Sequence, residues 1–420
     1  MKTLFRNKQY LFLICAQIVS SLGDWLNILA LLILAGVDFH ASPLGITLLM
    51  LCFSIPMTLF GPFTGVFADR YDRKKLMVAA DLIRAAAVFG IVFAPALWTV
   101  YILVFLQSSF SALFTPAKNG KLKEIIPDDQ MQQAVTISAM IDQVSKIIGP
   151  VLSGLLISAF STKASFYIDA ATFILSAIFL SQLTISVPKR ISENHSKKKN
   201  RIFHDMMDGF SFIRSIPILL LGLCVLSSVL LVLQIADNQI IILLREVPHS
   251  PVKIFGYAMA ASGAGMFIMS IILAKKEIKS AHAFISIGSV GIGAGYALMV
   301  YLVHQPVNII MACLPLLGML VGMSAAAVFI PFNVMAQKTT PVNLSGRIFG
   351  TINSMTSGAA IIGMVLGGIL VELFGADTTF LLSGSFLIII GIAAILSTVF
   401  LKGSDMFAKG NQGSQKKAQG

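Results

Sequence analysis

Long runs of apolar residues, separated by short polar turns, fill most of the chain. A helix that crosses the hydrocarbon core of a bilayer needs about 20 mainly apolar residues. Most of the runs have about this length and little amphipathic period, as expected for helices between lipid and apolar neighbours. The pattern predicts twelve membrane-spanning helices, at 11–36, 44–67, 76–96, 98–114, 134–160, 165–184, 216–240, 255–273, 282–303, 307–330, 349–373 and 379–401.

The distribution of Lys and Arg predicts how these helices are oriented. Cytoplasmic loops of membrane proteins carry an excess of both residues. Of the 31 Lys and Arg, only Lys163, Arg245 and Lys253 fall in the odd-numbered loops, and Arg84 and Lys146 fall within spans. The others lie at the chain ends and in the even-numbered loops, so we expect both termini to be cytoplasmic. The net charge of +12 is explained by this topology and does not indicate nucleic-acid binding.

Composition excludes several classes of protein. The chain is 56% hydrophobic and 12% charged, whereas soluble domains are about 25% charged, so the bilayer is its expected solvent. The sequence lacks a Gly-rich phosphate loop followed by Lys-Ser or Lys-Thr, which argues against an ATPase. Its four Cys are isolated and its His do not cluster, so we expect neither a metal nor a cofactor. Without a nucleophile–base arrangement, an enzyme is not expected.

The two halves of the chain match each other at an offset of 214–215 residues. Phe114-Thr115-Pro116 falls on Phe329-Ile330-Pro331, and 149–154 falls on 363–368. Parallel repeats related by an axis along the membrane normal place a substrate site between them, near the midplane. The sequence therefore predicts an all-α polytopic membrane protein with two pseudo-symmetric six-helix bundles.

One long hydrophilic connection, which contains Lys197-Lys198-Lys199, follows the sixth span. The end of the chain is rich in Gly, Gln and Lys, a composition typical of disorder. We expect an N-terminal bundle at 1–185, a cytoplasmic linker at 186–214, a C-terminal bundle at 215–401 and a disordered cytoplasmic tail at 402–420.

A charged motif, Gly65-Val66-Phe67-Ala68-Asp69-Arg70-Tyr71-Asp72-Arg73-Lys74-Lys75, lies at the turn between spans 2 and 3. It resembles the loop signature of the major facilitator superfamily, Gly-x-x-x-Asp-Arg-x-Gly-Arg-Arg/Lys, with Asp72 in place of the second Gly. A carboxylate is favoured near a helix start, and the cations can hold cytoplasmic helix ends together in one conformation. The alternative is a purely topogenic cluster of positive charge. We expect a gating latch made of Gly65, Asp69, Arg70, Arg73, Lys74, Asp81 and Arg84.

Span 5 carries a ladder of small residues that ends in Gly149-Pro150-Val151-Leu152-Ser153-Gly154. The ladder resembles the antiporter motif of the same superfamily, which ends in Gly-Pro-x-x-Gly-Gly. Small residues permit close helix packing, and Pro150 allows a bend. The resemblance implies export, with Gly149, Pro150, Ser153 and Gly154 as a hinge. The alternative is an ordinary packing face.

Four further segments, Gly23-Asp24-Trp25, 81–85, 114–117 and Ser345-Gly346-Arg347, are similar to the macrolide-efflux and siderophore-exporter branch of that superfamily. The resemblance covers the chain up to about residue 400. It implies efflux of amphipathic compounds from a bacterial cytoplasmic membrane, driven by a gradient of protons or another ion.

Ionisable residues inside spans are costly in a bilayer and are functional candidates for that reason. Asp24 lies about half-way along span 1, and the 214-residue offset matches it with Asn238, beside Asp237 in span 7. By the resemblance both spans line the central cavity, where we also place Gln107. We expect Asp24 and Asp237 to carry protons. The alternative for Asp24 is a structural hydrogen bond to a neighbouring helix.

Span 5 contains a second pair of candidates, Asp142 and Lys146, which lie four residues apart on one helix face. They can form a static contact or a switch that protonation breaks. Many proton-driven relatives have an Arg in span 4, where this chain has Gln107. If coupling needs an Arg, Arg84 or Lys146 has to supply it. Asp169, near the external end of span 6, is expected to be solvated.

Together these features predict a secondary active transporter that exports amphipathic drugs such as macrolides by proton-coupled alternating access. A dedicated exporter of one endogenous metabolite, lipid or siderophore is the first alternative, and a non-transporting membrane sensor or scaffold is the second. The expected partners are the lipid bilayer, a small amphipathic substrate and a coupling ion, with the protein as a monomer.

Overall fold

The computed structural model describes residues 4–184, 211, 213–245, 247, 251–274, 281–340 and 345–417. Within these ranges the structure does not describe the side chains of residues 61–63, 65–70, 128, 129, 132, 136, 139, 143, 146, 147, 150, 158, 218, 251, 252, 274, 338, 345–347 and 397–417. Most of the predicted linker at 186–214 therefore lies outside the described residues, and the predicted boundaries of the two bundles stay predictions.

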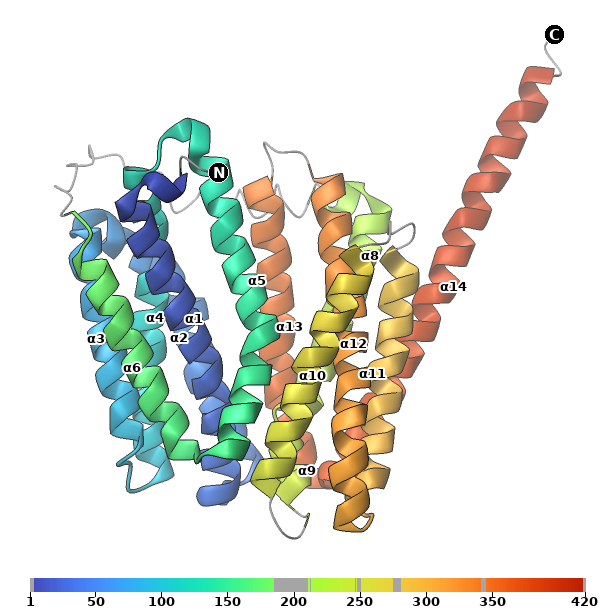
Figure 1. Cartoon of the computed structure of the whole chain (residues 1–420). Coiled ribbons are helices and arrows are strands. Elements are labelled where there is room, and N and C mark those ends of the chain that lie inside the picture. The colour runs from blue at the N-terminus through green and yellow to red at the C-terminus, as the bar shows by residue number, and fades with distance from the viewer. Residues whose placement is uncertain are drawn as a thin grey trace.

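The described chain is all helical, and each predicted apolar run corresponds to one long helix (Figure 1). Ten of the described helices are long and apolar enough to cross a membrane, while α3 and α5 complete the predicted twelve. The chain is thus a multi-pass helical membrane protein. A short turn, η1 (Leu4–Arg6), precedes α1. The helices are α1 (Lys8–Ile33) with its π-helical end η2 (Leu34–Asp38), α2 (Pro43–Arg70), α3 (Arg73–Ile91), α4 (Leu97–Ile125), α5 (Asp128–Ala159), α6 (Thr162–Ser181), α8 (Pro217–Asp237), α9 (Ile240–Arg245), α10 (Pro251–Ala274), α11 (Ala281–Val303), α12 (Val307–Thr339), α13 (Ser345–Phe374) and α14 (Ala376–Lys417).

Three helices extend beyond their predicted ends. Helix α4 continues through Pro116, and α12 continues through Pro331, although we expected turns at both places. A proline removes only one backbone donor, and the other backbone groups are satisfied best by a continuing helix. Helix α14 extends to Lys417, so residues 402–417, for which we expected disorder, are helical. No proline follows span 12 to interrupt the helix there.

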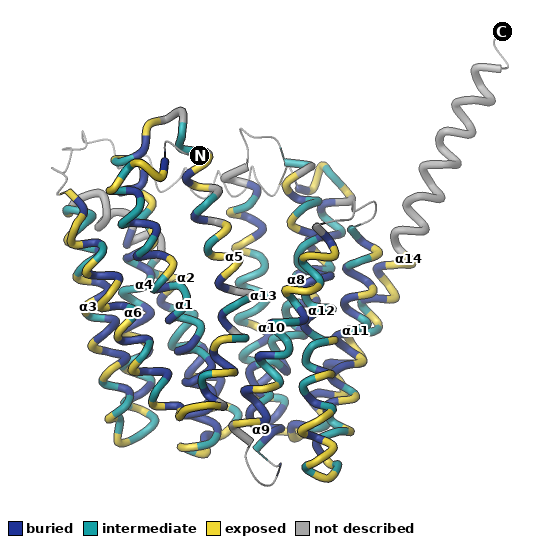
Figure 2. The backbone as a smooth tube through the Cα atoms, viewed as in Figure 1, coloured by how far each residue is buried: buried dark blue, intermediate teal, exposed yellow. Residues whose placement is uncertain are grey.

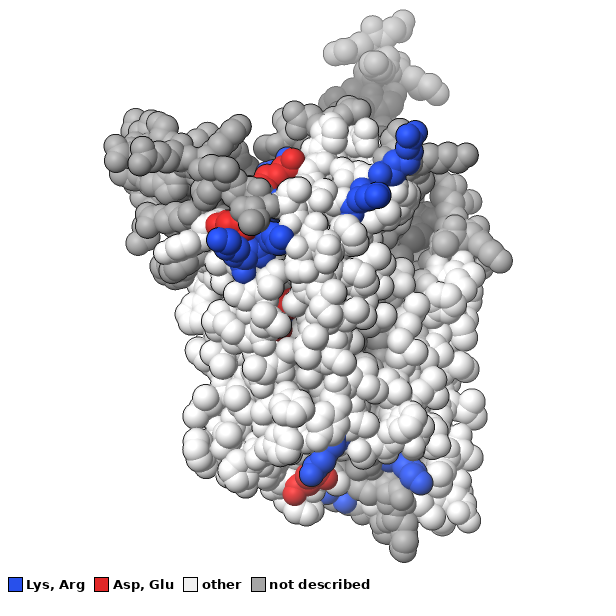
Figure 3. Space-filling model, turned by 60° about the vertical axis from the view of Figure 1, so that its left-hand side comes forward, with Lys and Arg blue, Asp and Glu red and all other residues white. Residues whose placement is uncertain are grey.

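The helices pack in two groups. In the first, α1 packs against α5 and α6, and α4 packs against α2 and α3; in the second, α11 packs against α12 and α14, and α13 packs against α8. Figure 2 shows buried residues through the middle of both groups and exposed residues along the outer faces. Large exposed apolar side chains on these faces, such as Phe89, Ile178 and Tyr301, suit contact with lipid. Figure 3 shows Lys and Arg gathered at the two ends of the molecule, with an almost uncharged belt between them.

The contacts between the two groups follow the predicted pseudo-symmetry. Helix α5 packs against α10, and α2 packs against α13. Under the repeat α2 corresponds to α10 and α5 to α13, so a two-fold axis exchanges these two contacts. Glycines on equivalent helices also pack alike: Gly149 of α5 lies against Trp25 of α1, and Gly363 of α13 lies against Leu231 of α8. The repeat that the sequence shows is therefore a repeat of packing.

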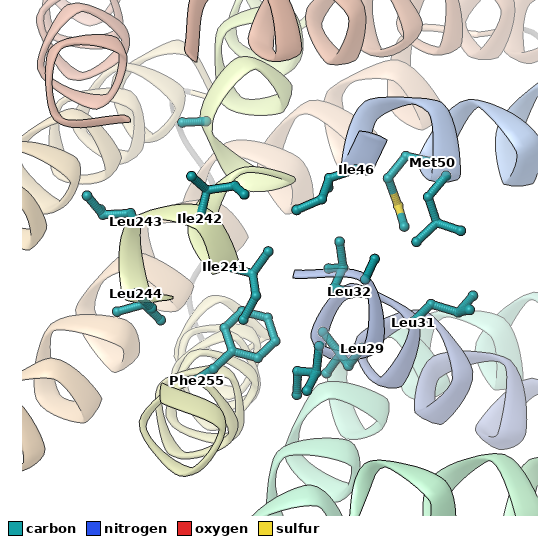
Figure 4. Close-up of a cluster of buried hydrophobic side chains, with 14 of the residues drawn as sticks. Leu29, Leu31, Leu32, Ile46, Met50, Ile241, Ile242, Leu243, Leu244 and Phe255 are labelled. Atoms are coloured by element: carbon teal, nitrogen blue, oxygen red, sulfur yellow. The ribbon is translucent and has the colours of Figure 1, made fainter. Parts of the chain in front are cut away.

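The end of the molecule opposite the termini is closed by contacts between the two groups. An apolar cluster joins them there, with Leu29, Leu32 and Ile46 on one side and Ile241 and Phe255 on the other (Figure 4). By the predicted orientation this end is external.

Polar side chains strengthen the same closure by hydrogen bonding to backbone oxygens across the groups. Arg245 Nη1 donates to the carbonyl of Ala41 at 3.1 Å, and Gln239 Nε2 donates to the carbonyl of Pro43 at 3.1 Å. Gln239 also donates to Thr47 Oγ1 at 3.1 Å. Because α5 and α10 cross near this end and separate toward the termini in Figure 1, the two groups are held together mainly at the predicted external end.

We expect the α5–α10 crossing to be sensitive to side-chain volume. A Cβ atom at Gly154 would meet the carbonyl oxygen of Gly256 and the backbone of Ala260. Gly154→Val should lower the free energy of unfolding by about 1–3 kcal/mol, the usual cost of overpacking. Thermal unfolding in detergent measures this. Gly358→Ala, where a Cβ meets nothing within 4 Å, is the control, and equal unfolding temperatures for both variants would contradict the prediction.

Candidate functional site

A buried ion pair joins α1 to α3 inside the N-terminal helices. Arg84 Nη2 of α3 donates to Asp24 Oδ1 of α1 at 2.6 Å, and Arg84 Nη1 donates to Asp81 Oδ1 at 3.1 Å. The side chains of Arg84 and Asp81 are 3% and 0% exposed, whereas that of Asp24 is 33% exposed. Charge-assisted hydrogen bonds of this kind are the strong ones in proteins. Asp24 is thus both paired with the cation and the most accessible member of the group.

Aromatic rings enclose the guanidinium from two more helices. The ring centroid of Phe173 on α6 lies 3.9 Å from Arg84 Cζ, and that of Phe114 on α4 lies 5.7 Å from it. A cation over the face of an aromatic ring is attracted by the ring quadrupole. Arg84 is therefore held by side chains of α1, α3, α4 and α6, and water has little access to it.

The prediction that Asp81 and Arg84 belong to the cytoplasmic latch is wrong. Both side chains are buried in the bundle, where they form ion pairs with each other and, through Arg84, with Asp24. The two residues lie three apart, so they share a helix face, and the rotation of α3 turns that face toward α6 and lets Arg84 reach Asp24 of α1. Sequence spacing indicates that the two are neighbours, but it does not indicate which helix they face.

The expectation that Asp169 is solvated is also wrong. Asp169 is 0% exposed and interacts electrostatically with Arg84, Asp24 and Asp81. It lies two turns inside α6, on the face that packs against α1. The close approach depends on Gly23, because a Cβ atom at that position would meet Asp169 Oδ1 and Thr172 Oγ1. A glycine directly before Asp24 was the one sequence signal for this contact.

Gln107 is not an open cavity residue. Its side chain is fully buried, and Gln107 Oε1 accepts a hydrogen bond from Asn27 Nδ2 at 2.8 Å. Asn27 lies three residues after Asp24 on α1, so this pair lies one turn from the ion pair on a neighbouring part of the same face. Gln107 therefore ties α4 to α1 where we expected it to contact substrate.

The match between Asp24 and Asn238 does not hold either. Trp25 packs on Gly149, whereas Leu231 and Gln234 of α8 pack on the equivalent Gly363. This places the counterpart of Asp24 about one to two helical turns before Asn238, among apolar residues of α8. Asp237 and Asn238 instead lie at the end of α8, close to the closed end of the molecule. In the part of the chain that the structure describes, the charged network therefore lies in the N-terminal helices.

Asp142 forms a second polar cluster, with Gln17, Ser138 and Lys118. Gln17 Nε2 donates to Asp142 Oδ1 at 2.8 Å, Ser138 Oγ donates to Gln17 Oε1 at 2.7 Å, and Lys118 Nζ donates to Ser138 Oγ at 3.2 Å. The side chain of Lys146, which we expected to pair with Asp142, lies outside the described residues. Gln17 was missed by the sequence analysis, although it lies seven residues before Asp24 and hence on the same face of α1.

The described part of the latch motif lies on α3. Asp72 caps this helix, since its side chain accepts a hydrogen bond from Lys75 N at 2.8 Å, which explains a residue other than Gly at this position. Arg73 pairs with Glu124 at 2.5 Å and joins α3 to the end of α4. Lys74 is half-exposed on the first turn. The side chains of Asp69 and Arg70, and the surroundings of Gly65, lie outside the described residues.

The small-residue motif of span 5 occupies two contacts of α5. Gly149 lies against Trp25 of α1, Gly154 lies against α10, and Ser153 is fully buried. The side chain of Pro150 is not described. The motif therefore lets α5 pack closely against both groups of helices, and its role as a hinge stays a prediction. In the part of the chain that the structure describes, no three His, Cys, Asp or Glu side chains are arranged to hold a metal ion.

Comparison with known proteins agrees with this architecture. The family model of the Major Facilitator Superfamily matches residues 13–363. The chain belongs to this superfamily. It is 41% identical over 416 residues to an uncharacterized MFS-type transporter, YfiS, of Bacillus subtilis (strain 168), with 99% of each chain covered. The chain is therefore a secondary transporter of the superfamily and not an enzyme.

Two more distant comparisons bear on function and fold. The chain is 27% identical over 350 residues to macrolide efflux protein A of Streptococcus pyogenes, which covers 80% of this chain and 83% of the relative. The crystal structure of a bacterial homologue of the human lysosomal transporter Spinster superposes with a TM-score of 0.68 at 13% identity. That match covers 94% of this chain and 98% of the other, and it supports the fold alone.

Removing the cation should leave the buried carboxyl groups without compensation. Arg84→Gln should lower the free energy of unfolding by about 3–5 kcal/mol, as expected when one partner of a buried ion pair is lost. Lys75→Gln, an exposed cation on the same helix, is the control and should change stability little. Thermal unfolding of both purified variants in detergent measures the difference, and an Arg84 variant as stable as the control would contradict this account of the site.

Proposed function

We propose that this chain exports amphipathic compounds from the cytoplasm of a bacterium in exchange for protons, and that Asp24 is the residue that binds the coupling proton. The observation that carries the proposal is the ion pair of Asp24 with Arg84, in which the carboxylate is one-third exposed and the cation is buried. A carboxyl group that water can reach can gain or lose a proton. The state of that proton then decides whether the buried cation has a partner.

Protonation of Asp24 would act on the packing of the helices. While Asp24 is ionised, its 2.6 Å contact with Arg84 Nη2 joins α1 to α3. A protonated Asp24 no longer neutralises the cation, so α1 is freed from this contact. Because α1 also packs against α5, which crosses to the other group of helices, a shift of α1 reaches the contact between the two halves. This is a route from proton binding to alternating access.

The closure at the end opposite the termini is consistent with alternating access. With both termini cytoplasmic, the contacts of Arg245 and Gln239 with the start of α2 and the end of α1 shut the external side. In the proposed cycle, this arrangement is the stage at which substrate enters from the cytoplasm. The π-helical turn at Leu34–Asp38 lies in this closure, and such turns are frequent at functional sites. Opening the external side requires these contacts to break.

The substrate class rests on the relatives and on composition. A relative that covers most of this chain is named a macrolide efflux protein. The chain contains 30 Phe and 19 Met, side chains whose flat or flexible apolar surfaces suit varied amphipathic ligands. Export of a single endogenous metabolite, lipid or siderophore is the alternative to this polyspecific export, and it predicts the same proton coupling.

Replacement of Asp24 tests the coupling. Asp24→Asn should abolish transport that is driven by a pH gradient in inverted membrane vesicles, because the amide cannot exchange a proton. Glu372→Gln, an exposed carboxyl group on α13, is the matched control and should retain transport. Full gradient-driven transport by the Asp24→Asn protein, with expression equal to wild type, would remove Asp24 from the coupling role.

Whole-cell accumulation tests the substrate class. Cells that express the protein should accumulate less of a macrolide and of a lipophilic dye, and an uncoupler should remove the difference, since export then lacks its gradient. A chemically unrelated drug should compete with both compounds. Export of only one compound, unaffected by unrelated drugs, would favour the dedicated exporter, and the absence of any flux would favour the sensor or scaffold.

A further inference from the structure

Arg84 and Asp169 each have a buried hydrogen-bonding atom without a partner. Arg84 uses Nη2 for Asp24 and Nη1 for Asp81, while its Nε makes no hydrogen bond. Asp169 accepts a hydrogen bond from Thr172 Oγ1 at Oδ1, at 3.3 Å, while its Oδ2 accepts none. Asp81 Oδ2 is a further unsatisfied acceptor of this cluster, although Asp81 already pairs with Arg84 through Oδ1. Unsatisfied buried donors and acceptors are costly, unless a second arrangement of the cluster uses them.

The side chains of Arg84 and Asp169 lie close enough for such an arrangement. Asp169 and Phe173 lie four residues apart and thus on one face of α6, and the ring of Phe173 stacks on the guanidinium at 3.9 Å. Gly23 leaves room for the carboxyl group of Asp169 next to α1. The interaction between Asp169 and Arg84 is already attractive in this arrangement. A change of side-chain rotamer at Arg84 is the movement required, because α3 and α6 are in contact.

The charges of the cluster do not balance when every carboxyl group is ionised. The titratable groups that face Arg84 are Asp24 from α1, Asp81 from α3 and Asp169 from α6, and α4 contributes the ring of Phe114. One cation shared by three carboxylates leaves two negative charges in an apolar bundle. A buried carboxyl group without a cation of its own takes up a proton instead. Of the three carboxyl groups, Asp169 is the one that has no ion pair in the structure, and it is fully buried. We therefore assign the proton to Asp169.

We propose that Asp169 is the second partner of Arg84, so that the guanidinium pairs with Asp24 while Asp24 is ionised and moves to Asp169 when Asp24 takes up a proton. In the first state Asp169 is protonated. In the second state the proton of Asp169 has passed to Asp24, so the charge of the network does not change. This inference rests on the proposed proton coupling through Asp24, and it makes Asp169 a positioning residue for Arg84.

The exposure of the two carboxyl groups gives the switch a direction. Asp24 is 33% exposed while the predicted external end is closed, so its proton exchanges with the cytoplasmic side in this conformation. Asp169 is fully buried two turns from the start of α6, which lies at the end opposite the termini. Access to Asp169 thus belongs to the conformation that opens outward. A proton taken up there would displace Arg84 toward Asp24 and release the proton of Asp24 inward.

A structure of the Asp24→Asn protein tests the switch without a transport assay. The Asn side chain imitates a protonated Asp24, so Arg84 should lie within hydrogen-bonding distance of Asp169 in that structure. In the Asp169→Asn protein, which imitates a protonated Asp169, Arg84 should keep its contact with Asp24. An Arg84 that leaves Asp24 in the first variant without approaching Asp169, or that does not move at all, would overturn the proposal.

The pH dependence of transport supplies the second test. In Asp169→Asn the guanidinium has no second partner, so Asp24 should bind protons less readily and the pH of half-maximal efflux should fall by about one unit or more. The KM for substrate should stay unchanged, Asp169→Glu should restore the wild-type profile, and Glu372→Gln serves as the control. A wild-type pH profile for Asp169→Asn, together with an inactive Asp24→Asn, would overturn this inference alone. Gradient-driven transport by Asp24→Asn would instead overturn the proposed function.

Discussion

The free-energy cost of holding a cation inside an apolar helix bundle governs the arrangement of the N-terminal half. The side chain of Arg84 is 3% exposed, so water contributes little to its solvation. Its charge is therefore compensated by carboxyl groups from α1 and α3 and by aromatic rings from α4 and α6. These four helices must keep their relative rotations for the contacts to exist. The proposed coupling uses this requirement, because a proton on a partner of Arg84 removes part of the compensating charge.

Close packing of helices makes these charged contacts possible. Gly23 allows α6 to approach α1, and Gly149 and Gly154 allow α5 to contact α1 and α10. In a bilayer, where lipid is as apolar as the helices, small residues supply much of the packing between them. Gly149 and Gly154 therefore place α5 in contact both with α1, the helix that carries Asp24, and with α10 of the C-terminal half.

The two halves share a backbone plan but not their chemistry. Gly149 and Gly363 make equivalent contacts with α1 and α8, yet the charged network has no counterpart on α8, where apolar residues occupy the equivalent turns. The C-terminal half instead contributes Gln239 and Arg245 to the closure of the predicted external end. Symmetry thus governs how the two groups of helices contact each other. In the proposed function, the asymmetric charged residues are the place where proton binding acts.

Local pattern alone determined the all-helical class, the positions of the twelve apolar runs and the pseudo-symmetric repeat, because apolar length and glycine spacing are properties of the chain itself. It also indicated Asp24 as an unusual charge within a span. The side chains that contact Asp24 depend on how the helices pack. Arg84 pairs with Asp24 inside the bundle, Asp169 is buried, and Gln107 is hydrogen-bonded to Asn27. Sequence fixes which residues share a helix face, whereas the rotation and tilt of each helix, which set the partner of that face, result from packing over the whole bundle.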